Sequence, residues 1–152
     1  MGRVLSEFSV GEVFRPQGRE ITAADIDTFA GLTGDRNPVH VDQGVAEPLF
    51  GGRIAHGPLF PGLAFGMLSE FDLIDGTVVA LRNLAWEFNA PVRIGDRVSL
   101  SAEVTAVTPH PDRTDRGRIA LKMTFTNQNQ ETVSTGTATV TVQTDRGETQ
   151  DG

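Results

Sequence analysis

The sequence predicts an α+β protein in which one antiparallel sheet curls around a long apolar helix. Apolar side chains recur every four residues between His56 and Ile74 until little polar surface remains, which is typical of a helix covered nearly all round. Beyond Gly76 the period changes to two, which indicates half-buried antiparallel strands. Because a sheet cannot leave its apolar face in water, we expect the strands to wrap around the helix.

The first half of the chain is predicted to be helical and rich in loops, after a possible strand around residues 11–15. Thr22 and Asp25 form a start signal for a short helix over residues 23–32, since the hydroxyl can accept a bond from a free backbone N–H. The apolar helix follows. Pro58 suits its first turn, whereas Pro61 with Gly62 predicts that the regular helix starts late or is bent.

The second half is predicted to consist of four antiparallel strands. Residues 97–107 and 118–126 alternate strictly between apolar and polar side chains, and residues 131–144 are rich in β-branched residues. An earlier strand covers residues 77–89 and ends before Pro91, and residues 127–130 form a hairpin turn. No internal repeat interrupts this order.

Length and composition limit the possible classes of protein. A chain of 152 residues suits one core, so we expect a single domain over residues 1–145 and a frayed tail over residues 146–152. The net charge of −7 argues against nucleic acid as a partner, and the lack of cysteine excludes thiolate chemistry. No apolar run suggests a secretory signal or a membrane partner, so a cytoplasmic protein is expected.

The segment "GLTGDRNPVHVD" brings titratable groups together in a stiff loop. Asp35 and His40 can act as a general acid–base pair near neutral pH if both face one water or substrate proton. Pro38 restricts the backbone between them. The same residues are also good turn formers, so this segment by itself is better explained as a surface turn.

A second motif, "FGGRIAHGPL", favours a site over a turn. Its Gly57 lies where the apolar helix is expected to begin, and its unobstructed N–H can stabilise negative charge that develops on a substrate oxygen. His56 is interpreted as a structural residue at this helix entrance. The three histidines lack metal-ligand spacing, so no metal is expected.

Three motifs together resemble the MaoC-like dehydratases, which include the R-specific enoyl-CoA hydratases of the hot-dog fold. They are "LTGDRNPVHVD", "FGGRIAHGPL" and "FNAPVRIGDRV", and the resemblance covers nearly the whole chain. It implies that Asp35 and His40 are the catalytic pair that activates water and handles the proton at C2. It also implies that the Gly57 N–H receives the thioester oxygen.

The resemblance implies a hydro-lyase that interconverts trans-2-enoyl and (R)-3-hydroxyacyl thioesters carried on coenzyme A or an acyl carrier protein. It implies a homodimer and no metal or redox cofactor. We expect further substrate contacts from four residues: Asn37, Phe60, Phe65 and Trp86. The run from Pro58 to Gly62 departs from the family pattern, because two prolines and Phe60 can reshape the acyl pocket.

Two alternatives remain open from the sequence. A hot-dog thioesterase would use a carboxylate on the central helix, for which Glu70 and Asp72 are available far from Gly57. A non-catalytic subunit that binds acyl thioesters would result if the segment 58–62 had closed the pocket. Retention of Asp35 and His40 argues against this second alternative.

Overall fold

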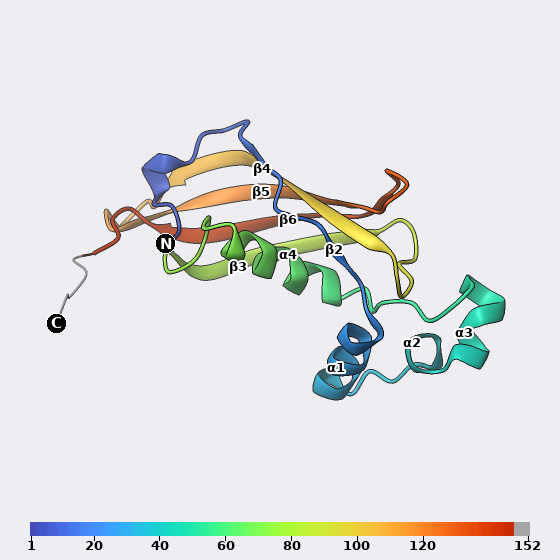
Figure 1. The fold of residues 1–152 in the computed structure, drawn as a ribbon. Coiled ribbons are helices and arrows are strands. Elements are labelled where there is room, and N and C mark those ends of the chain that lie inside the picture. Colours follow the sequence, from blue (N-terminus) through green and yellow to red (C-terminus); the bar gives the residue numbers. More distant parts are fainter. Residues whose placement is uncertain (148–152) are drawn as a thin grey trace.

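The computed structural model describes residues 1–147 and confirms the α+β architecture. Five strands pair in the order β1-β4-β5-β6-β3, all antiparallel, and the short β2 (Arg19–Glu20) also pairs with β4. In Figure 1 the helix α4 runs along one face of this sheet, whereas α1, α2 and α3 gather beyond one end of it. The predicted tail 146–152 lies mostly outside the described residues.

The strands confirm the period-two prediction. They are β1 (Val13–Phe14), β3 (Val78–Phe88), β4 (Arg97–Pro109), β5 (Arg116–Thr126) and β6 (Thr132–Gln143). Alternate residues of β4, β5 and β6 are buried on the face that covers α4, and they meet Phe60, Ala64 and Leu68 of this helix in one hydrophobic core. The sequence reasoning did not predict β2.

The helix α1 (Ala23–Thr33) begins and ends as its sequence predicts. The Thr22 hydroxyl accepts the Asp25 N–H, the Asp25 carboxylate accepts the Thr22 N–H, and Gly34 closes the helix at φ +78°. Burial raises the pKa of Asp25, but hydrogen bonds from Thr22 and Arg19 outweigh this effect and lower the pKa below its usual value. Both ends of α1 are therefore defined, and the loop toward α2 begins at Gly34.

The central helix is shorter than predicted. α4 covers Leu59–Glu70 rather than residues 56–74, because Pro58 occupies the N-cap position and Asp72 adopts φ +59° just after the last turn. Pro61 lies in the first turn, where its missing N–H has no partner to lose, so it does not delay the helix.

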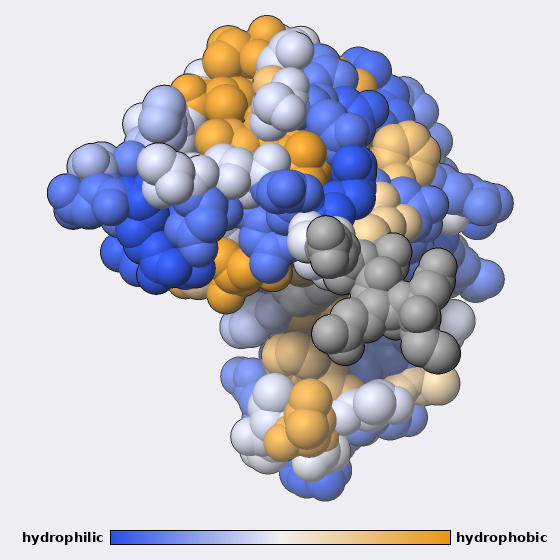
Figure 2. Space-filling view, turned by 90° about the vertical axis from the view of Figure 1, so that its left-hand side faces the viewer, coloured by the Kyte–Doolittle hydropathy of each residue, from blue (hydrophilic) through white to orange (hydrophobic). Residues whose placement is uncertain are grey.

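The segment between α1 and α4 is more regular than the sequence suggested. Residues 38–41 form the short helix α2 (Pro38–Val41), and an unpredicted helix α3 (Gln43–Phe50) follows. Gly44 and Pro48 hide this helix from pattern analysis, but the Asp42 carboxylate caps it by accepting the N–H groups of Gly44 and Val45. In Figure 2 the lower part of the molecule is narrower than the upper part.

Candidate active site

The loop that carries Asp35 is held by hydrogen bonds at both ends. The Asp35 N–H donates to the Thr33 hydroxyl over 3.2 Å, and its carbonyl accepts from the Nε2 of His56 over 2.9 Å. The exposed carboxylate accepts the Asn37 N–H over 3.3 Å. The turn chemistry of this loop therefore orients the carboxylate, so that the turn and the site are one feature.

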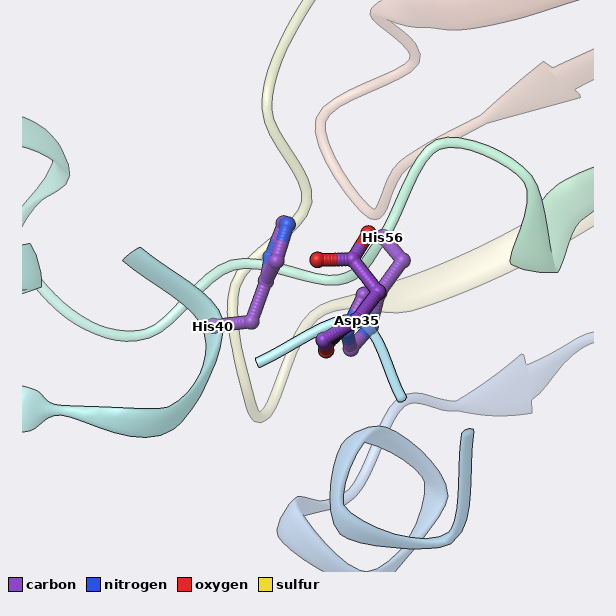
Figure 3. Close-up of side chains that lie close together, drawn as sticks. All are labelled: Asp35, His40 and His56. Carbon is purple, nitrogen blue, oxygen red and sulfur yellow. Dashed lines mark hydrogen bonds between the residues drawn. The ribbon is translucent and has the colours of Figure 1, made fainter. Parts of the chain in front are cut away.

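His40 lies in α2 with its imidazole fixed from behind. Its Nδ1 is 2.8 Å from the Ile54 carbonyl, which can only accept a hydrogen bond, so in the neutral ring Nδ1 carries the proton and Nε2 is the basic atom. Figure 3 shows the Asp35 carboxylate directed toward this ring. One side-chain atom each of Asp35, His40 and His56 lie within 4.8 Å of one another.

His56 packs directly against His40. The two rings are stacked with centroids 3.9 Å apart and an angle of 26° between their planes, and His56 is fully buried. An imidazole binds a metal along a direction in its own ring plane, at about 2.0–2.1 Å for zinc. Because the two planes are tilted by only 26°, one ion cannot lie close to both ring planes at that distance, so the cluster suits proton transfer better than metal binding.

Arg53 links α2 to α1, a role that was not predicted from the sequence. Its Nε donates to the His40 carbonyl over 2.5 Å, and its guanidinium pairs with Asp27 of α1. The side chain is only 14% exposed. Arg53 thereby joins α1 and α2 and holds the backbone of His40. Its guanidinium has structural partners, so we assign it no role in binding the phosphates of coenzyme A.

Gly57 directly precedes the turn that starts α4, as predicted. Within residues 1–147 no carbonyl or side chain accepts its N–H. A Cβ at this position would lie 3.0 Å from Cε1 and 3.1 Å from Cζ of Phe88, so any larger residue would displace this ring or the backbone. The free N–H and the missing side chain together suit an oxyanion donor.

His40 and Gly57 line one cavity of about 380 Å³ at the end of the sheet that faces α2. This volume is within the usual range for a small-molecule site. The cavity contains no Asp, Glu, Lys or Arg, and most of its wall is apolar. Its other lining residues are Phe50, Ile54, Ala55, Phe60, Phe88, Asn89, Ala90, Pro91, Val92, Val133 and Ser134.

The remaining predicted substrate contacts occupy different places. Phe60 lines the cavity, and its ring meets Phe125 edge-on at 5.3 Å. Asn37 is exposed at the start of α2, and Phe65 and Trp86 are half-buried against the core without lining the cavity. The structure therefore places His40, Gly57 and Phe60 in the cavity wall and Asp35 beside His40, whereas the other three lie outside this wall.

Strand register places two cavity residues, Phe88 and Ser134, that were not predicted from the sequence. Phe88 of β3 and Phe125 of β5 both lie opposite Ser134 of β6. The alternation of each strand predicts which face a residue occupies, but it does not predict its neighbour on the next strand. The ring of Phe88 also lies against Gly57, in another part of the sequence.

Comparison with known proteins agrees with the fold described above. A protein from Mycobacterium tuberculosis described as a double hot-dog fold superposes with a TM-score of 0.82 at 22% identity, over 99% of this chain and 47% of that chain. A sheet wrapped around one helix is this hot-dog fold. The family model of the MaoC like domain matches residues 7–125, and the chain belongs to this family.

Two similar curated proteins are named as enzymes that act on acyl-CoA thioesters. A 3-hydroxybutyryl-CoA dehydratase of Methylorubrum extorquens is 41% identical over 62% of this chain and 60% of its own length. An (R)-specific enoyl-CoA hydratase of Rhodospirillum rubrum is 39% identical over 60% of this chain and 62% of its own. The matches thus span about three fifths of these curated relatives.

A solved MaoC-like dehydratase from Rhodospirillum rubrum is similar over most of its length. It superposes with a TM-score of 0.81 at 29% identity and covers 93% of this chain and 97% of that chain. Among residues 1–147, no helix is long and apolar enough to cross a membrane.

Proposed function

We propose that this chain is a hydro-lyase that adds water to a trans-2-enoyl thioester, giving the (R)-3-hydroxyacyl thioester, and that it also catalyses the reverse reaction. The observation that carries the proposal is an apolar cavity lined by His40, with its basic Nε2, and by Gly57, with its free N–H, while the Asp35 carboxylate lies close to the His40 side chain. The names of the relatives support coenzyme A as the carrier.

The chemistry needs only groups that this site contains. Asp35 and His40 hold the water and take one proton from it as its oxygen attacks C3. Negative charge then develops on the thioester oxygen, where the Gly57 N–H can stabilise it. The pair delivers one proton to C2 and so returns to its starting protonation state. We propose that no metal or redox cofactor takes part.

The two alternatives receive less support. Glu70 is exposed at the far end of α4, about 17 Å along the helix axis from Leu59, and does not line the cavity. Asp72 lies beyond this helix and pairs with the N-terminal amine. A closed, non-catalytic pocket is disfavoured because a cavity of about 380 Å³ is present beside Phe60.

The function is tested by following the conjugated enoyl thioester after adding protein to trans-2-enoyl-CoA substrates of several chain lengths. We expect the conjugation to disappear without release of free thiol, and the product to be the (R)-3-hydroxyacyl-CoA. Thiol release that Glu70→Gln abolishes would indicate a thioesterase instead. Tight binding without turnover, unchanged in His40→Ala, would indicate a binding subunit.

We also propose that the protein acts as a homodimer joined along β3. This strand ends the sheet order, so one of its edges is unpaired in the single chain. It exposes Val79, Leu81, Leu84 and Phe88 by 40–54% each, an apolar edge that a monomer would leave open to aggregation. Light scattering is expected to give twice the mass of one chain, and Leu81→Glu to give a monomer.

The matched control is Leu32→Glu, which changes a leucine that is 83% exposed on α1, away from β3. This variant is expected to keep the mass of the wild type. A wild-type protein that is monomeric at micromolar concentration would contradict the homodimer.

A further inference from the structure

One buried hydroxyl in the cavity lacks a partner. Ser134 of β6 is 1% exposed, and its Oγ makes no hydrogen bond within the described chain. It lines the same cavity as His40 and Gly57. A buried polar group left unpaired costs about 1–3 kcal/mol, and alanine at this position would avoid that cost. The only other polar side chain of the cavity besides His40 is Asn89, which is exposed and can bond to water.

Ser134 is flanked by large aromatic side chains. Its neighbours across the sheet are Phe88 on β3 and Phe125 on β5, so a small residue stands between two large rings. Phe60 of α4 packs on Phe125 and also lines the cavity. Ser134 therefore adds a hydroxyl, flanked by aromatic rings, to the wall of the cavity that His40 and Gly57 also line.

Trp86 packs against Gly136, the next inward-facing residue of β6. A Cβ at Gly136 would lie 1.9–2.4 Å from ring atoms of Trp86, so the indole lies flat over the glycine and leaves no room beside it. Trp86 thus forms a wall behind Ser134 although it does not line the cavity itself.

We infer that the acyl chain of the substrate carries a neutral oxygen group, a hydroxyl or a ketone, that hydrogen-bonds to Ser134. This inference rests on the proposed function and names the substrate class for the same site. A carboxylate is disfavoured, because the cavity lacks Lys and Arg and an unpaired charge would lose its hydration there. An unsubstituted chain would leave the Ser134 hydroxyl unpaired in the complex. Ser134 is thus a specificity-determining residue.

The test compares trans-2-hexenoyl-CoA with its 4-hydroxy, 5-hydroxy and 5-oxo derivatives. We expect the wild type to favour at least one oxygenated substrate by about tenfold or more in kcat/KM, as sites built to bond a hydroxyl do. In Ser134→Ala this ratio is expected to fall to about one. Ser101→Ala changes a serine of β4 outside the cavity and is expected to keep the wild-type ratio.

A second readout separates this inference from the proposed function. The dissociation constants of hexanoyl-CoA and 5-hydroxyhexanoyl-CoA, which cannot be hydrated, are measured by calorimetry for the wild type and Ser134→Ala. A preference for the hydroxylated ligand that Ser134→Ala removes would support the inference even if no enoyl thioester is hydrated. An equal loss with every substrate, or no preference in either assay, would overturn it.

Discussion

Replacing Asp35 with asparagine is expected to lower kcat/KM for enoyl thioester hydration by about 10²–10⁴-fold, the usual loss when a general acid–base group is removed. The fold should survive, because asparagine keeps the side-chain oxygen that accepts the Asn37 N–H. His40→Asn should have a similar effect, since its amide nitrogen can replace Nδ1 as donor to the Ile54 carbonyl while the basic Nε2 is lost. Both variants thus separate chemistry from loop structure.

The matched control for this pair is Asp42→Asn. Asp42 lies near the same loop but caps α3, and asparagine retains this cap. Its activity should remain within about twofold of wild type, since asparagine and aspartate cap helices about equally well. The double variant Asp35→Asn/His40→Asn should be hardly worse than either single variant, because the two groups act as a unit. Nearly full activity in Asp35→Asn would refute the assigned pair.

Gly57→Ala is expected to lower kcat by about 10²-fold, the scale of a misplaced oxyanion donor. The new methyl group would lie 3.0 Å from the Phe88 ring, so either this ring or the Gly57 backbone must shift. Both outcomes disturb the place where the thioester oxygen would bind. Steady-state kinetics with a single enoyl-CoA substrate measures the loss, and thermal unfolding shows whether the fold is retained.

A second substitution separates the collision from other causes. In Gly57→Ala/Phe88→Ala the ring is gone and the methyl group has room, so most of the lost kcat should return. Phe88→Ala by itself provides the reference for the loss of the aromatic wall. If the double variant is no better than Gly57→Ala, contact with Phe88 does not explain why glycine is required.

Much of the architecture follows from local rules. The start of α1 depends on hydrogen bonds between Thr22 and Asp25, which are three residues apart, and the strands follow from side chains that alternate between core and solvent. The failures are also local in origin. Helix α3 was missed because Gly44 and Pro48 oppose helical propensity, whereas a cap from Asp42 and tertiary contacts outweigh it.

The sequence by itself determined the fold class and proposed the pair Asp35 and His40 with Gly57, because each of these depends on periodicity or on short motifs. Only the tertiary structure decided that the His40 ring stacks on His56, that Arg53 holds its backbone, and that Ser134 faces the same cavity. These contacts join residues 13 or more positions apart through strand register and packing. Local periodicity carries no information about such pairings, so they appear only once the chain has folded.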